Sequence, residues 1–485
     1  MTIKPTQEQL DILEAFKANK ILKVNSVAGA GKTSTLKMLA EYNPEKSLYI
    51  CFNKAIADEA SSKFPEHVLC KTTHAVAYNP FGVNISHKLK RPVGPYKNVA
   101  GTASEIARYF KIKDFEVNQF DTIRAVAIAT FVKFTVKRFQ TNVENSISQK
   151  HLPKGELLEL QRTHFGINIE KLQKIILQHA KTLWKERCDP KSPVLADHDT
   201  YMKLWQLSNP HLNYDILYVD EAQDSNPVLL DVVKKQSHCK VVYVGDTYQS
   251  IYEFRNAKNA MELISAPTKV LSKSFRYGSK IANVAKYIIN NEIDVKGLET
   301  LDSKVGAIIS EKYTKLFRTN AALLEDAVYK IGNGGKVYCA ISHDEFVKKL
   351  SSADALYNKD MKNVKDESIT PYSTWLELKE AAKEDPELQR LVKIVESYRV
   401  EEFLSAFEKL IYSEKEADII LTTAHKSKGK EWSNVVIADD FDLSKVFGPK
   451  RNQQEVNLLY VACTRAIDNL QLSDALEEEI PECKI

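Results

Sequence analysis

The sequence predicts an α/β fold with two sheets, each interrupted by a mainly helical insertion. Short apolar runs that end directly on polar residues, at 216–219 and 241–244, are typical of buried parallel strands. A loop of small residues at 25–31 lies between an apolar run and a helix-like run, as in proteins that hold phosphate groups. Strand-like runs fade at 80–195 and 343–415, where helical spacing and charged residues take over.

The elements follow this outline along the chain. In the first half, we expect strands at 21–24, 48–52 and 68–70, a helix at 33–40, and an amphipathic helix within 122–139. In the second half, residues 270–271 open another α/β region with a helix over 280–290 and a strand at 336–341. Apolar runs at 419–421 and 435–437 restore the strand pattern, and 458–463 is typical of the start of a buried helix.

Composition places the chain among ordinary globular proteins. It has 485 residues, of which 27% are charged and 44% hydrophobic, with a net charge of +4. That charge is too small by itself to indicate a nucleic-acid partner. Seven scattered cysteines without a C-x-x-C pair favour reduced thiols over disulfides or a zinc site. No apolar run approaches the length of a membrane span, so we expect a cytoplasmic or nucleoid-associated protein (nuclear in a eukaryote) that is neither secreted nor membrane-bound.

Polar residues follow two of the predicted strands. The first strand delivers Asp220, Glu221 and Gln223, and the second delivers Asp246 and Gln249. The carboxyl ends of parallel strands meet at one edge of a sheet, so these side chains should lie near one another. Carboxylates and an amide suit a metal-bound phosphate and an attacking water.

The loop after the first strand supplies the matching phosphate cradle. Backbone N–H groups and a helix N-terminus can hold phosphate oxygens, Lys32 can reach the β- and γ-phosphates, and Thr33 can ligate Mg²⁺. Ser26 stands where the general pattern has its first glycine. Gly31 matches the second glycine of that pattern, and the other residues that we expect to bind the nucleotide here are Gly29, Ala30 and Ser34. The sequence therefore predicts a P-loop protein that hydrolyses a nucleoside triphosphate.

The second half adds basic residues at the ends of predicted elements. Arginines near a γ-phosphate stabilise the charge of phosphoryl transfer, and Arg276 and Arg465 are the candidates. If they come from a second domain, its closure depends on the bound nucleotide, which is the physical basis of a motor. A basic stretch with an aromatic residue, at 87–97, has two interpretations: a nucleic-acid backbone contact or a solvated face.

The ordered motifs resemble the UvrD/Rep family of superfamily 1 helicases across nearly the whole chain. The motifs that carry this resemblance are TQEQ (6–9), AGAGKTS (28–34), TTH (72–74), VDEAQD (219–224), GDTYQSIYEFR (245–255), SFR (274–276), TAHKSKGKEW (423–432) and LLYVACTRA (458–466). The resemblance implies two RecA-like domains that form an ATP cleft. Their expected boundaries are 1–79 with 196–266 for the first, 267–342 with 416–485 for the second, and 80–195 and 343–415 for the insertions.

The resemblance also implies a role for each matching residue. Around ATP and Mg²⁺, Gln9 reads the adenine, Phe275 stacks on it and Glu431 meets the ribose. Lys32 and Thr33 hold phosphate and Mg²⁺, Asp220 supports Mg²⁺, Glu221 activates water, and Gln249, Arg276 and Arg465 meet the γ-phosphate. The implied contacts to single-stranded DNA and to junctions of single- and double-stranded DNA are Thr73, His74, Phe254, Arg255, His425 and Lys428.

Within the family, 52–60, 70–78 and 201–210 are most similar to the helicase region of the eukaryotic F-box DNA helicases. The element around Gln9 begins close to the first residue, so we expect no F-box ahead of it and no ubiquitin-ligase association.

The family resemblance implies translocation on DNA in the 3′→5′ direction with unwinding, in repair, recombination or replication. Two alternatives stay open at this point: a translocase that strips proteins from DNA, and a regulatory subunit of a nuclease or defence complex. Recombination, replication or nuclease proteins are the partners that these functions imply.

Overall fold

The computed structural model describes residues 4–90, 100–251, 260–340, 343–366, 368–370, 372, 374–382, 386–397 and 400–480. Contacts between residues divide the chain into two compact units. The first unit comprises the described residues of Met1–Val24, Thr33–Gly245 and Tyr252–Lys269. The second comprises those of Asn25–Lys32, Asp246–Ile251 and Val270–Ile485, so the phosphate cradle and the segment around Gln249 group with the C-terminal half.

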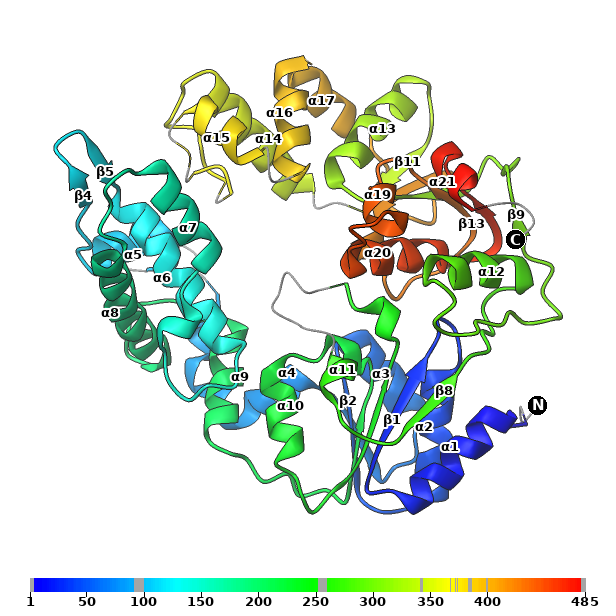
Figure 1. Ribbon diagram of the computed structural model, residues 1–485. Coiled ribbons are helices and arrows are strands. Elements are labelled where there is room, and N and C mark those ends of the chain that lie inside the picture. Colours follow the sequence, from blue (N-terminus) through cyan, green and yellow to red (C-terminus); the bar gives the residue numbers. More distant parts are fainter. Residues whose placement is uncertain are drawn as a thin grey trace. The chain divides into compact units, whose positions relative to one another are not determined.

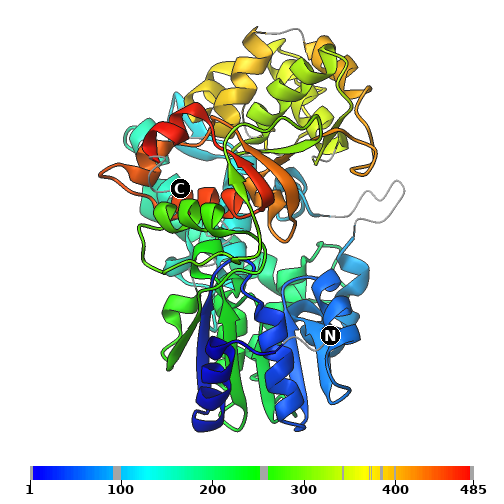
Figure 2. The same cartoon turned by 90° about the vertical axis from the view of Figure 1, so that its right-hand side faces the viewer.

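The first sheet has six strands in the order β3-β2-β6-β7-β1-β8. Their bounds are β1 (Ile21–Ser26), β2 (Ser47–Cys51), β3 (Val68–Thr72), β6 (Ile216–Val219), β7 (Lys240–Gly245) and β8 (Thr268–Leu271). β2 pairs in parallel with β3 and β6, and β6 pairs in parallel with β7. Every residue of β2 and β6 is buried, which explains their unbroken apolar runs. Figure 2 shows the strands of this sheet running side by side.

Helices surround the first sheet, as Figure 1 shows. Their bounds are α1 (Gln7–Ala18), α2 (Lys32–Tyr42), α3 (Lys54–Lys63), α4 (Thr73–Ala77), α9 (His198–Leu207), α10 (Pro227–Lys234) and α11 (Ala260–Leu263). Several of these helices begin where a strand ends, so their N-termini lie at the same edge as the polar strand ends. The packing of α9, α10 and α11 against β2, β6 and β7 forms one apolar core cluster.

The helical insertion of the first unit has its own core. It consists of α5 (Ala103–Tyr109), α6 (Ala125–Gln140), α7 (Lys154–Thr163) and α8 (Ile169–Cys188), with the antiparallel hairpin β4 (Phe115–Asn118) and β5 (Asp121–Ile123). The insertion is mainly helical, as expected, with one short hairpin that the sequence did not indicate, and α6 begins at Ala125, inside the expected 122–139. Strands of three and four residues are too short to show a period of two in the sequence.

The second sheet also has six strands, in the order β11-β12-β10-β13-β14-β9. Their bounds are β9 (Lys304–Val305), β10 (Tyr313–Phe317), β11 (Val337–Cys339), β12 (Ile419–Thr423), β13 (Trp432–Ile437) and β14 (Ala466–Gln471). All five neighbouring pairs are parallel. The accompanying helices are α12 (Ser279–Ile288), α13 (Asn320–Gly332), α18 (Ala424–Ser427), α19 (Leu443–Phe447), α20 (Gln453–Cys463) and α21 (Asp474–Glu479).

A second helical group interrupts the second sheet between β11 and β12. It consists of α14 (His343–Tyr357), α15 (Trp375–Ala382), α16 (Pro386–Ser397) and α17 (Val400–Phe407). Its apolar faces pack with α13 into one core cluster that includes Leu350, Ile394 and Phe403. The α/β fold with a helical group inside each half is therefore confirmed.

Two expectations about single elements were wrong. Residues 270–271 were expected to open the second α/β region, but they are the end of β8 (Thr268–Leu271), which is the last strand of the first sheet, beside β1. It is an edge strand with three exposed residues, so its sequence carries no sign of the sheet that it joins. Residues 458–463 are the end of α20 and not its start. The first turn of this helix is polar, so a search for apolar runs misses where the helix begins.

All six cysteines in the described residues are free. In the same part of the chain, no helix combines the length and apolarity that crossing a bilayer requires.

Candidate nucleotide site and nucleic-acid contacts

The phosphate cradle links β1 to α2. Gly29 and Gly31 have φ angles of +75° and +77°, which side chains with a Cβ rarely adopt. A Cβ built on Gly29 would lie 2.7 Å from both Arg276 Cβ and Ser274 Oγ, so this position needs a glycine for space as well. Ala30 is buried, and α2 begins at Lys32, which places Thr33 and Ser34 in its first turn. The cradle therefore ends at the N-terminus of an eleven-residue helix, where backbone N–H groups attract anions.

The acidic pair follows β6. Asp220 is 5% exposed; its Oδ1 accepts a hydrogen bond from the Glu221 N–H at 2.8 Å, and its Oδ2 accepts one from the Tyr49 hydroxyl at 2.5 Å. Burial and the charge of Asp220 raise the pKa of Tyr49 well above its ordinary range, so the phenol stays a donor. The orientation of the Asp220 carboxylate is thus fixed on both sides.

Glu221 has a backbone conformation that is uncommon for its type. Its φ is +50°, in the left-handed region, at the point where the chain leaves β6. Gln223 Nε2 donates to Glu221 Oε2 at 2.6 Å and holds the carboxylate. Gly245 makes room for this amide, since a Cβ there would lie 2.4 Å from Gln223 Oε1. Strained backbone with a held side chain is common at functional sites.

Gln249 lies in a buried polar network with Asp246. Its Nε2 donates to Asp246 Oδ2 at 2.7 Å, and its backbone oxygen accepts a hydrogen bond from Lys428 Nζ. Tyr460, fully buried on α20, donates to Asp246 Oδ2 at 3.3 Å and accepts from the N–H of Ala28 at 3.1 Å. One chain of hydrogen bonds therefore joins the cradle, Gln249 and an expected DNA-contacting lysine.

The two arginines lie in the second unit with the cradle. Arg276 Nε donates to Glu431 Oε2 at 2.7 Å, and its Nη1 donates to the Thr464 carbonyl at 3.0 Å. Arg465 is 1% exposed and donates from Nε to the Val461 carbonyl at 2.9 Å. Burial and the charge of Arg276 lower the pKa of Arg465 to about 9. Arg276 is only partly buried and is neutralised by Glu431, whereas Arg465 is fully buried and bonds to backbone carbonyls.

Two residues that were expected to meet the nucleoside differ in their surroundings. Phe275 is 41% exposed beside the cradle, and its N–H donates to the Gly29 carbonyl at 2.9 Å. Gln9 is buried: its Oε1 accepts the Thr6 N–H, and its Nε2 donates to Thr35 Oγ1, both at 3.0 Å. Gln9 thus has a structural role in capping α1 and tying it to α2, which its sequence motif does not reveal.

Expected DNA contacts and acidic residues share one cavity of about 470 Å³ in the first unit. Thr73 and His74, at the start of α4, line it together with Asp220 and Glu221. The tyrosine hydroxyl of Tyr201 lies 3.1 Å from His74 Nδ1, and burial lowers the pKa of His74. The same cavity contains side chains that the sequence analysis did not single out: Phe52, Lys137, His198 and Asp199.

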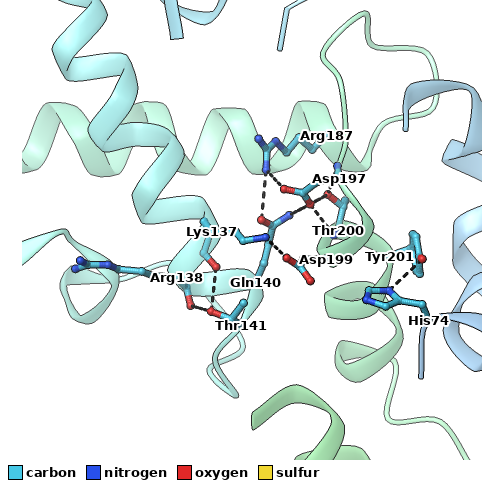
Figure 3. Close-up of polar contacts among 10 residues, drawn as sticks. All are labelled: His74, Lys137, Arg138, Gln140, Thr141, Arg187, Asp197, Asp199, Thr200 and Tyr201. Atoms are coloured by element: carbon cyan, nitrogen blue, oxygen red, sulfur yellow. Dashed lines mark hydrogen bonds and ion pairs between the residues drawn. The ribbon is translucent and has the colours of Figure 1, made fainter. Parts of the chain in front are cut away.

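A buried polar network holds the helices that form the wall of this cavity (Figure 3). Asp197, the N-cap of α9, accepts hydrogen bonds from Arg187 Nη1 at 2.9 Å and from Gln140 Nε2 at 2.8 Å. Burial favours the neutral acid, but the charges of Arg187 and Lys137 lower the pKa of Asp197 below its ordinary value. Lys137 of α6 also pairs with Asp199 of α9. No local motif marks these residues, because the network exists only once α6, α8 and α9 pack together.

The remaining expected DNA contacts lie in the second unit or outside the described residues. Burial lowers the pKa of His425 to about 4, with a smaller contribution from the charge of Arg318, so His425 is neutral near pH 7. Lys428 contacts the backbone of Gln249 as described above. Phe254 and Arg255 lie outside the described residues, as do 91–99 of the basic stretch.

The described part of that stretch does not form a nucleic-acid contact through Lys88. Lys88 is 3% exposed, and its ammonium donates to the carbonyls of Glu186, Arg187 and Asp189. These carbonyls lie at the C-terminal end of α8, where a positive charge is favourable. Both sequence interpretations, backbone contact and solvated face, are wrong for this residue.

The fold and the site together define the class of the protein. A cradle between strand and helix, an acidic pair at a neighbouring strand end and two parallel sheets are the features of a RecA-like, P-loop protein. The chain belongs to the UvrD/REP helicase family: the N-terminal domain of that family matches residues 6–266, and the UvrD-like helicase C-terminal domain matches residues 418–472. The resemblance inferred from the motifs is therefore confirmed.

Two curated relatives extend the similarity to nearly the whole chain. F-box DNA helicase 1 of Gallus gallus is 32% identical over 98% of this chain and 49% of its own length. F-box DNA helicase protein 1 of Schizosaccharomyces pombe is 30% identical over 97% of this chain and 57% of its own length. The chain thus spans about half the length of the curated relatives it matches.

Proposed function

We propose that this protein is an ATP- and Mg²⁺-dependent motor that moves along single-stranded DNA, in the 3′→5′ direction of its family, and unwinds duplex. The observation that carries the proposal is the position of Gln249. Its side chain bonds to Asp246, which accepts a hydrogen bond from Tyr460, and Tyr460 accepts the N–H of Ala28 in the cradle. The backbone oxygen of Gln249 accepts a hydrogen bond from Lys428. A few hydrogen bonds within the protein therefore connect the γ-phosphate side of the site to Lys428, the cation that we assign to DNA binding.

The residues present fit ATP and Mg²⁺. Among the described residues there is no group of three or more His, Cys, Asp or Glu side chains that could hold a metal ion. Mg²⁺ does not require such a group, because it keeps several waters and takes one or two protein ligands together with substrate phosphates. Thr33 and Asp220 would hold it, and the bound ion would neutralise charge that develops on the phosphates.

The chain's own residues would perform the other steps. Lys32 and the N–H groups at the start of α2 bind the phosphates, with Ser34 in the same turn. Glu221, whose carboxylate accepts a hydrogen bond from the Gln223 amide, orients and deprotonates the attacking water. Arg276 and Arg465 stabilise the charge of the transferring phosphoryl group, while Phe275 and Glu431 meet the base and ribose. We retain 1–79 with 196–266, and 267–342 with 416–485, as the proposed RecA-like domains.

The cavity beside the acidic pair supports the DNA part of the proposal. Its wall combines an aromatic ring, Phe52, and imidazole rings with the Lys137 ammonium, which pairs with Asp199, and with other carboxylates, among them Asp220. Aromatic rings stack on bases without sequence preference, and cations follow the phosphate backbone, as a translocating protein requires. His425 is neutral at pH 7, so it would contact DNA by hydrogen bonding rather than by charge.

The test is the ATPase rate with single-stranded DNA, duplex DNA and RNA, together with strand displacement on 3′- and 5′-tailed duplexes. We expect stimulation by single-stranded DNA and displacement from a 3′ tail. Lys32→Ala should lose the stimulated rate, because no other ammonium of the cradle can reach the β- and γ-phosphates. Lys37→Ala is the matched control: Lys37 is a partly exposed lysine on the same helix, paired with Glu41 at 3.4 Å. A Lys32→Ala protein with the wild-type rate would contradict the proposal.

A further inference from the structure

A buried tyrosine holds the carboxylate that we assign to Mg²⁺. Tyr49 is the central residue of β2, and none of its side chain is exposed. Its hydroxyl donates to Asp220 Oδ2 at 2.5 Å, and its ring packs against Phe64 with 4.9 Å between the ring centres. The sheet fixes the distance, because Tyr49 pairs in register with Tyr218 on β6, two residues before Asp220.

Asp220 needs such a partner because of its place in the chain. Its N–H donates to the Ile50 carbonyl at 2.9 Å, so its backbone still belongs to the sheet, but its side chain lies beyond the last paired residue of β6. Rotation of a carboxylate about its last bond is only weakly restricted. The Glu221 N–H holds Oδ1, and without Tyr49 the other oxygen would lose its hydroxyl donor.

We propose that Tyr49 is a positioning residue for Mg²⁺: its hydroxyl sets the plane of the Asp220 carboxylate, and thereby the affinity for the Mg²⁺–nucleotide complex. The inference rests on the proposed function, in which Asp220 supports the ion. Partners of metal-binding carboxylates outside the ligand set typically change metal affinity or activity by about 10- to 100-fold. Tyr49 carries no recognisable motif, since it is one apolar-looking position in a buried strand.

The first experiment measures binding and not turnover. A fluorescent ADP analogue is titrated into wild type and Tyr49→Phe, once with Mg²⁺ and once with EDTA. We expect the affinity in EDTA to be unchanged and the gain in affinity from Mg²⁺ to fall by about 10-fold in the variant. The Mg²⁺ concentration that gives half of the maximal DNA-stimulated ATPase rate should rise by a similar factor.

Two further variants separate positioning from simple packing. Tyr243→Phe removes a hydroxyl from another buried tyrosine, on β7, that packs in the apolar core cluster of the first sheet. It should leave the effect of Mg²⁺ at the wild-type level. 4-Aminophenylalanine introduced at position 49 keeps a donor on a ring of the same shape, and should restore most of the Mg²⁺ effect even if Tyr49→Phe lowers the unfolding temperature.

The outcomes distinguish the inference from the function on which it rests. If wild type binds the nucleotide equally well with and without Mg²⁺, the proposed function fails and the inference fails with it. If wild type responds to Mg²⁺ and Tyr49→Phe responds equally, only the inference is overturned. A loss of the Mg²⁺ response in Tyr243→Phe as large as that in Tyr49→Phe would also overturn it, because the effect would then come from any buried hydroxyl.

Discussion

Single residues with unusual backbone torsions mark both halves of the proposed site. Glu221 and Gly29 both have positive φ angles, the first as a strained side-chain-bearing residue and the second as a glycine. The strain at Glu221 is maintained because the Glu221 N–H and the Gln223 amide hold the residue on two sides. The position of Gly29 requires glycine, because its neighbours leave no room for a Cβ.

The first prediction concerns Gly29. Gly29→Ala should weaken nucleotide binding by more than 10-fold and lower stability by about 1–3 kcal/mol, because the left-handed conformation and the contact with Arg276 both oppose a methyl group. Gly155→Ala is the control: it lies in the first turn of α7 with open space around an added Cβ, and should be neutral or stabilising by up to ~1 kcal/mol. Calorimetric unfolding and nucleotide titration measure both. Unchanged binding in Gly29→Ala would contradict the assigned cradle.

At the scale of elements, helix α1 shows how one side chain has two tasks. Thr6 and Gln9 form a capping box: the Thr6 hydroxyl accepts the Gln9 N–H, and the Gln9 amide accepts the Thr6 N–H. The same amide donates to Thr35 on α2, the helix that follows the cradle. A change at Gln9 therefore acts on helix stability as well as on any contact with adenine.

The second prediction separates these two tasks. Thr6→Ala removes only the cap and should lower the unfolding free energy by ~1 kcal/mol with unchanged nucleotide affinity. Gln9→Ala should cost about 1–3 kcal/mol, because it also removes the buried hydrogen bond to Thr35, and should in addition reduce the preference for ATP over other nucleoside triphosphates. Denaturant unfolding and competition binding give the two quantities. Equal effects of both variants on nucleotide preference would show that Gln9 serves only the helix.

At the scale of the whole molecule, nucleotide binding should raise the free energy of unfolding. A ligand that binds only the folded chain stabilises it by about 2.7 kcal/mol at 100 times its dissociation constant. A non-hydrolysable ATP analogue with Mg²⁺ should therefore raise the unfolding temperature of wild type. Arg276→Ala should keep most of this shift while its turnover falls by on the order of 10³-fold, because the role that we propose for this arginine is to stabilise the transition state. A wild-type chain without a shift would argue against nucleotide binding.

Much of this molecule could be predicted from the sequence. The buried strands could be predicted because both of their faces are covered, so their residues form uninterrupted apolar runs. The cradle and the acidic pair were visible because their chemistry needs particular residues at fixed spacing along one loop. The hairpin β4–β5, the sheet that β8 joins and the buried role of Lys88 were not visible, because short or exposed elements carry no period and a lysine looks the same in water and in a helix cap.

The sequence by itself determined the fold class, the phosphate cradle and the family, since each depends on neighbours in the chain. Only the tertiary structure placed Tyr49 on Asp220, Lys428 on Gln249, and Lys137, His74 and Glu221 around one cavity. These residues are far apart in sequence, and hydrogen bonds of this kind form only when separate strands and helices pack. Motifs therefore identify the groups that carry the chemistry, while packing decides which side chains hold those groups in place.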